Sequence, residues 1–118
     1  MSGDDDRRFD GLPRRELGSG RVVIEAQTHR SRRRVLARLD SLAPEQALHI
    51  PQCPAVHTFG MRFALDLIWL ARDGTVVRVD HDVPRGRMRI CVKARSVIET
   101  AAGHADAFLA AGLSPESR

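Results

Sequence analysis

The sequence predicts a small α+β domain that is mainly β, and three observations carry this prediction. Residues 64–71, with the exception of Asp66, are apolar on both faces, which is typical of a central strand covered on both sides. Asp73-Gly74 follows and is typical of a tight hairpin turn in which both loop positions need a positive φ. Several further short segments alternate as strands do, whereas only two short segments have the pattern of a helix.

The elements are expected in a simple order along the chain. Residues 1–19 are expected to form a flexible charged tail, with residues 20–118 as a single domain. Thr28 is expected to cap a helix that Pro44 stops, and Gly112 to end a second helix. The expected strands are 21–27, 47–50, 64–71, 75–79, 89–92 and 95–100, the expected helices are 28–42 and 105–111, and residues 80–87 are expected to form a polar loop.

Composition places the chain among folded globular proteins. Hydrophobic residues make up 42% and charged residues 29% of its 118 residues. No apolar run approaches the roughly 18 residues that a membrane helix needs. No secretion signal is visible at the N-terminus, and two cysteines cannot form a disulfide framework. We therefore expect a soluble cytoplasmic protein without a transmembrane segment.

The charge of the chain is positive, and one basic patch stands out. The net charge is +4, and a candidate patch comprises Arg30, Arg33, Arg34 and Arg38. On a helix, Arg30, Arg34 and Arg38 share one face and could meet phosphates. A solvated helix face is the favoured interpretation, because no nucleic-acid-binding motif accompanies the patch and aromatic residues total only 4%. Nucleic acid is therefore not the expected partner.

The segment CPAVHTFGMRFALD at residues 53–66 resembles a known family, as does RSVIETAAG at residues 95–103. The family is the bacterial and archaeal domain-of-unknown-function family 192, and the resemblance covers about residues 21–116. It implies a compact β-rich fold, a small distorted sandwich or barrel-like sheet with one or two short peripheral helices. It implies no activity, because none is established for the family.

The chain departs from the family at three places. The family often has proline where Ala64 stands, and Leu-Pro-Ala where Thr100-Ala101-Ala102 stand. After the last helix it usually continues with Gly-Asp and a closing strand, which we expect to be missing or vestigial here. Many members carry a secretion signal. No such signal is visible in this sequence, so we do not expect the periplasmic location of those members to apply to this chain.

Asp66 is the most unusual residue of the predicted central strand. It shares a face with Ile68 and Leu70, where an ionised carboxylate costs several kcal/mol unless it is paired. Arg62, His57 or backbone amides of the preceding loop are its expected partners. A functional interpretation makes Asp66 an acid, a base or a ligand anchor; the favoured structural one makes it a hydrogen-bond acceptor that pins the loop.

The loop before this strand contains the other candidate site residues. His57 can carry a proton near neutral pH, and Arg62 can bind a carboxylate or phosphate through two hydrogen bonds. The other candidates in this binding or functional loop are Cys53, Thr58 and Met61. A Cys53–His57 thiolate pair is disfavoured, because no orienting third group is identifiable. The residue spacing indicates no metal site, and no nucleotide or hydrolase motif is present.

Three functions follow from these residues. The leading hypothesis is a small non-catalytic accessory module that binds an unidentified small ligand or protein partner through residues 53–66, without a cofactor. The first alternative is an enzyme of unknown class in which Asp66 and His57 serve as acid and base, with Cys53 as a further candidate and no catalytic residue assigned. The second alternative is nucleic-acid binding through Arg30–Arg38, with affinity that falls steeply as salt rises.

Overall fold

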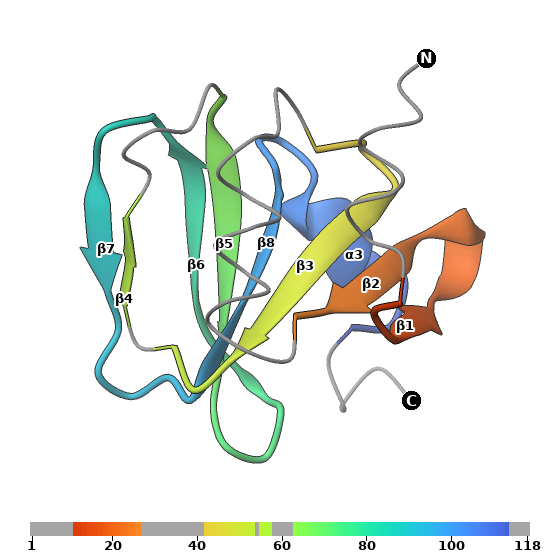
Figure 1. Cartoon of the computed structure of the whole chain (residues 1–118), viewed down its shortest axis with the longest axis horizontal. Coiled ribbons are helices and arrows are strands. Elements are labelled where there is room, and N and C mark those ends of the chain that lie inside the picture. Colours follow the sequence, from red (N-terminus) through yellow and green to blue (C-terminus); the bar gives the residue numbers. More distant parts are fainter. Residues whose placement is uncertain (1–10, 27–41, 54, 58–62, 114–118) are drawn as a thin grey trace.

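The computed structural model describes residues 11–26, 42–53, 55–57 and 63–113. A six-stranded sheet has the order β1-β2-β3-β8-β5-β6, and β4 and β7 form a second sheet (Figure 1). The described strands are β1 Arg14–Glu16, β2 Val22–Glu25, β3 Gln46–Pro51, β4 Ala55–His57, β5 Leu65–Leu70, β6 Val76–Val83, β7 Met88–Ile90 and β8 Ser96–Ala101, and the described α-helix is α3 Ala105–Ala110. The predicted fold class, mainly β with a short peripheral helix, is confirmed, and the described strands do not close into a barrel.

Strand β5 occupies an inner position of the larger sheet, as its apolar sequence predicts. It pairs with β6 on one side and with β8 on the other, both antiparallel, and all six of its residues are buried. Strands β2 and β3 pair in parallel, so the sheet is mixed. A strand that is apolar on both faces requires a cover on each side of the sheet.

Each face of the sheet has its own cover. On one face, Ile68 of β5 belongs to a buried cluster with Ala105 and Phe108 of α3. On the other face, Trp69 belongs to a second cluster that includes Val56 of β4. The two-stranded sheet therefore contributes to the core through one of its faces, and its opposite face is directed away from the core.

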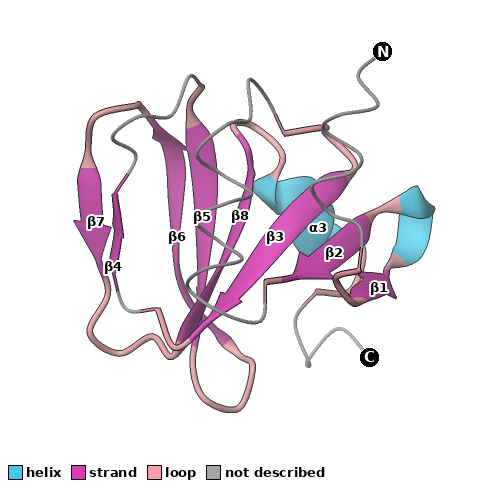
Figure 2. Ribbon diagram, viewed as in Figure 1, coloured by secondary structure: helices cyan, strands magenta, loops and turns pink. Residues whose placement is uncertain are grey.

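The N-terminal part of the sheet begins earlier than expected. Residues 14–16, which the sequence assigned to a flexible tail, form β1 and pair antiparallel with β2. A short 3-10 turn, η1 (Gly18–Gly20), connects the two strands (Figure 2). All three residues of β1 are exposed, so this edge strand has no apolar alternation by which the sequence would reveal it.

The hairpin between β5 and β6 lies at the predicted place with a different geometry. Only Gly74 has a positive φ, of 90°, so the expectation that both positions of Asp73-Gly74 have a positive φ is wrong. The amide of Gly74 donates to the carbonyl of Ala71, and that of Ala71 donates to the carbonyl of Thr75. The hairpin loop is therefore longer than two residues.

Strand β6 also extends beyond its predicted end. Residues 80–83, expected to begin a polar loop, continue the strand to Val83. A register shift lies between Leu65 and Leu67 of β5, where His81 and Asp82 together lie opposite Asp66. Such a β-bulge bends a strand while it keeps the pairing on both sides.

Candidate functional site

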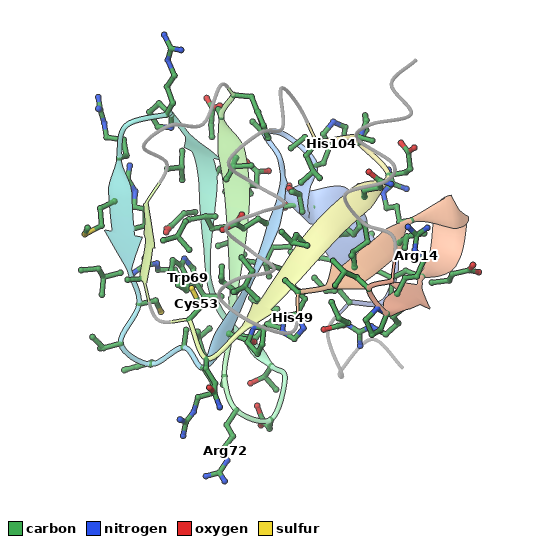
Figure 3. All side chains as sticks on the ribbon, in the orientation of Figure 1. Arg14, His49, Cys53, Trp69, Arg72 and His104 are labelled. Atoms are coloured by element: carbon green, nitrogen blue, oxygen red, sulfur yellow. The ribbon has the colours of Figure 1, made fainter. Side chains whose placement is uncertain are left out.

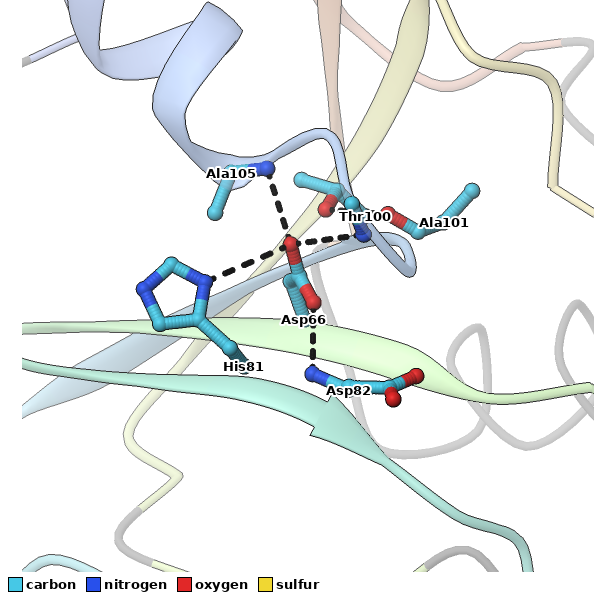
Figure 4. Close-up of polar contacts among 7 residues, drawn as sticks. Asp66, His81, Asp82, Thr100, Ala101 and Ala105 are labelled. Atoms are coloured by element: carbon cyan, nitrogen blue, oxygen red, sulfur yellow. Dashed lines mark hydrogen bonds and ion pairs between the residues drawn. The ribbon is translucent and has the colours of Figure 1, made fainter.

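The carboxylate of Asp66 is fully buried and accepts three backbone hydrogen bonds (Figure 4). Its Oδ1 accepts from the amide of Asp82 at 2.8 Å. Its Oδ2 accepts from the amides of Gly103 and Ala105, each at 3.0 Å. Hydrogen bonds to an ionised acceptor are among the strongest in proteins, so this arrangement offsets the cost of burying the charge.

These contacts join three elements at positions of unusual backbone. Asp82 has a φ of 56° in the β6 bulge, and Gly103 has a φ of 89° in the turn between β8 and α3. Amides at such positions are displaced from the regular ladder and need another acceptor. Asp66 provides that acceptor, so its described contacts are those of a structural residue.

The described partners of Asp66 are not among those that the sequence predicted. The described amides come from β6 and from the turn before α3, and most of the loop that precedes β5 lies outside the described residues. Arg62, one expected partner, lies outside the described residues. The imidazole of His81 lies 3.8 Å from Oδ2 of Asp66, at the exposed surface. Within the described residues, His81 of the bulge is therefore a histidine next to Asp66, whereas the side chain of His57 lies outside the description.

The described part of segment 53–66 contributes β4 and the residues on either side of it. Cys53 is buried, and its thiol donates to the carbonyl of Ala55 at 3.1 Å. His57 ends β4, where its backbone lies opposite Met88 of β7, and its side chain is outside the description. Thr58 and Met61 also lie outside the described residues, so the candidate roles of this loop stay predictions.

The basic patch Arg30, Arg33, Arg34 and Arg38 lies entirely outside the described residues, and the nucleic-acid alternative built on it stays a prediction. Within residues 11–26, 42–53, 55–57 and 63–113, no group of three histidine, cysteine, aspartate or glutamate side chains is placed to hold a metal ion. Across the same described ranges, no helix is long and apolar enough to span a membrane.

The outer side of the β4–β7 sheet presents apolar side chains to solvent. Met88 and Ile90 of β7 are 53% and 52% exposed, and Val92 beyond the strand is 86% exposed. Residues 84–98 contain five cations and no acidic residue. Exposed apolar groups are unremarkable singly, but three at alternating positions beside a run of cations form a surface that fits an anionic partner with an apolar part.

A hollow of about 680 Å³ opens beside the turn that follows β7. Backbone hydrogen bonds hold this turn, because the amide of Ala94 donates to the carbonyl of Cys91 and that of Arg95 to the carbonyl of Leu70. Gln52 has a φ of 51°, a conformation that costs a non-glycine residue about 1–2 kcal/mol. Three cations and no acidic residue line the hollow: its residues are Gln52, Arg72, Val92, Lys93, Ala94 and Arg95.

A second polar cluster connects β2, β3 and β8. The Nδ1 atom of His49 lies 2.6 Å from Oε1 of Glu25, and its Nε2 atom lies 2.9 Å from Oγ of Ser96. Figure 3 shows His49 at the end of the sheet near the hairpin that carries Arg72. The hydrogen bond from His49 lowers the pKa of the Glu25 carboxyl, an effect that burial opposes and that the charges of His49 and Arg15 assist.

This cluster could not be predicted from the sequence, because its members are far apart in the chain. Glu25 and His49 are separated by 24 positions, and His49 and Ser96 by 47. Glu25 lies directly opposite His49 in the parallel pair, and Ser96 lies opposite Pro51, two residues further along β3. One signal was available in the sequence. Glu25 lies two residues after Val23, and His49 two residues after Ala47, so each strand has a polar residue on an apolar face.

Two solved structures share the fold of this chain. The chain is 20% identical to a protein from Sinorhizobium meliloti 1021 that is provisionally described as a transcription regulator; the TM-score is 0.64, with 80% of this chain and 82% of that chain covered. It is 16% identical to a protein of unknown function from Novosphingobium aromaticivorans DSM 12444; the TM-score is 0.61, with 89% of each chain covered. At these identities the likeness shows the fold alone.

Among curated proteins, none matches this chain. A family model does match it, over residues 14–114, and that range contains every element from β1 to α3. The model is DUF192, described as "Uncharacterized ACR, COG1430". The chain belongs to the DUF192 family.

Proposed function

We propose that the protein is a binding module that recognises an anionic partner, either a small ligand with a carboxylate or phosphate group or a protein segment that carries such groups. The recognition surface comprises the described part of segment 53–66, strand β7 and the hollow beside it. The observation that carries the proposal is the hollow lined by Arg72, Lys93 and Arg95 next to exposed Val92.

Charge and shape support a binding role for this surface. A concave site with three cations concentrates anions, and an arginine guanidinium matches carboxylate and phosphate geometry. The neighbouring apolar side chains of Met88 and Ile90 supply area that a ligand with an apolar part can bury. Gln52 retains a strained conformation at the rim, as residues of binding sites often do.

The acid–base alternative has less support at this place. Asp66 has no exposed surface, and both of its oxygens already accept backbone hydrogen bonds. A general acid or base has to reach the proton that it transfers, either directly or through one water molecule. The described contacts of Asp66 therefore support pinning of the fold and not proton transfer to a substrate.

Nuclear magnetic resonance titration of the ¹⁵N-labelled chain tests the proposal. The probes are inorganic phosphate, decanoate below its micelle concentration, and a peptide of alternating glutamate and valine. We expect at least one probe to shift the amide signals of Gln52 and Val92–Arg95, with decanoate or the peptide also shifting Met88 and Ile90, and the shifts to weaken as salt is added.

Charge-removal variants make the test specific. The double variant Arg72→Ala/Arg95→Ala should weaken the binding at least about tenfold, as loss of two cationic contacts implies. Arg14→Ala/Arg15→Ala removes the same two charges from exposed β1 at the opposite edge of the sheet and serves as the matched control. The proposal is wrong if no probe shifts these signals, or if the double variant binds as the control does.

A further inference from the structure

Glu25, His49 and Ser96 have the connectivity of an activated nucleophile. A serine hydroxyl lies within hydrogen-bond distance of one imidazole nitrogen, at 2.9 Å, and a carboxylate lies within that distance of the other, at 2.6 Å. Nucleophile, base and orienting group at such distances are the diagnostic geometry of serine catalysis, whichever fold presents them. The three side chains lie on neighbouring strands of one sheet, so rigid elements hold them.

The carboxylate determines which nitrogen of His49 carries the proton. The pKa of Glu25 is lowered, so the group is ionised at neutral pH and can only accept a hydrogen bond. Nδ1 of His49 is therefore the donor, and in the neutral ring Nε2 is the acceptor. The hydroxyl of Ser96 then donates to Nε2. A general base needs this tautomer of His49, with the proton on Nδ1 and Nε2 free to accept.

We propose that Ser96 is a reactive nucleophile with His49 as its general base and Glu25 as the residue that positions His49, and that this site accepts small acyl groups from activated esters. The site goes beyond the proposed binding function, because no residue lining the hollow belongs to it. Ser96 is 9% exposed, and the side chain of His49 is 21% exposed. Because Ser96 is largely buried, we expect the site to accept only small acyl groups, of about acetyl size.

The reaction is an acyl transfer that needs no reagent other than ester and water. Ser96 Oγ bonds to the carbonyl carbon while its proton passes to Nε2 of His49, and the bond to the leaving oxygen breaks as His49 returns the proton to that oxygen. Water then attacks the acyl-serine and loses a proton to His49. The bond between the acyl carbon and Oγ breaks as His49 returns this proton to Oγ, which restores Ser96 and releases the carboxylic acid. With methanesulfonyl fluoride, the serine oxygen bonds to sulfur, its proton passes to Nε2 of His49 and fluoride leaves, which gives a stable adduct.

Mass spectrometry of the full chain after treatment with methanesulfonyl fluoride, whose sulfonyl group is about the size of acetyl, tests the proposal, together with the release of 4-nitrophenolate from 4-nitrophenyl acetate. We expect one adduct, located at Ser96 by peptide mapping, and a hydrolysis rate above that of buffer. Because the adduct is mapped on the parent protein, the result does not depend on whether a variant folds. An adduct elsewhere, or none at Ser96, overturns the proposal.

Three variants separate this chemistry from a structural role of the cluster. Ser96→Ala should abolish the adduct, and His49→Gln should slow its formation about 100-fold or more. His104→Gln is the matched control, since this histidine precedes α3 and its side chain makes no capping hydrogen bond. Equal labelling of His49→Gln and His104→Gln would overturn the role of His49 as the base.

Glu25→Gln tests the positioning residue. The neutral amide no longer stabilises the protonated imidazole, so labelling should slow and the midpoint of its pH profile should move to lower pH. If labelling of Ser96 did not depend on His49 and its contact with Glu25, the change would leave that profile where it is in the parent. An unchanged midpoint would therefore contradict the assignment of Glu25.

Discussion

Asp66→Asn removes the charge at the centre of the fold while it preserves the size and shape of the side chain. The parent carboxylate accepts from Asp82 through Oδ1 and from Gly103 and Ala105 through Oδ2. An asparagine has one acceptor oxygen and one donor nitrogen in the same places. In the better orientation, the oxygen retains Gly103 and Ala105, and the nitrogen faces the amide of Asp82 without a bond.

The cost of this change follows from the three contacts. A buried amide left without an acceptor costs about 1–3 kcal/mol. The two retained bonds lose the assistance of the charge, which is worth about 1 kcal/mol each. We therefore expect Asp66→Asn to lower the free energy of unfolding by about 3–5 kcal/mol, a large part of the stability of a small domain.

Urea unfolding measures this loss, and the chain has a convenient probe in its single tryptophan, Trp69, which is fully buried. Asp106→Asn is the matched control, because the same chemical change is made at an exposed position in the first turn of α3. The control should cost less than about 1 kcal/mol. A cost below about 1 kcal/mol for Asp66→Asn would refute the structural role described above.

Three further predictions concern other parts of the sheet. The carboxyl of Glu25 has a lowered pKa, so its stabilising effect is present above the ordinary value of 4.5 and is lost as the pH falls through the lower folded value. In urea unfolding, the stability advantage of the parent over Glu25→Gln should therefore shrink as the pH falls through that range. A difference that stays constant with pH would contradict this. Gln52→Gly should raise the free energy of unfolding by about 0.5–1 kcal/mol, because glycine adopts a φ of 51° without strain. An unfolding midpoint in urea below that of the parent would count against strain at Gln52. Asp80→Ala should lower the free energy of unfolding by about 1–3 kcal/mol, because Trp69 Nε1 and Arg78 Nη2 both donate to Asp80 Oδ2 at 2.9 Å. Unchanged stability would show that another acceptor replaces Asp80.

The sequence predicts those elements whose apolar residues follow a simple pattern. Strand β5 was predictable because it is apolar on both faces, and α3 because Phe108 and Leu109 precede Gly112. Strand β1 and the end of β6 were not, because exposed strands with charged side chains have no apolar alternation. Their membership in the sheet depends on backbone pairing, which any residue except proline can provide.

The polar sites were also predictable only in part. That Asp66 is buried and needs partners could be read from its apolar neighbours, but its partners are backbone amides, which carry no sequence signal. The cluster of Glu25, His49 and Ser96 depends on the register of three strands, one pair of them parallel. Register is a tertiary property, so an isolated sequence cannot place these side chains within hydrogen-bond distance.

The contacts of Asp66 also bear on the order in which the chain folds. Its partners are 16, 37 and 39 positions away, so all three bonds require β5, β6 and the turn before α3 to be in place together. Contacts that close such long loops are expected to form late, after the transition state has been crossed. We therefore expect Asp66→Asn to accelerate unfolding while it leaves the refolding rate nearly unchanged, so that Asp66 acts mainly on the lifetime of the native state.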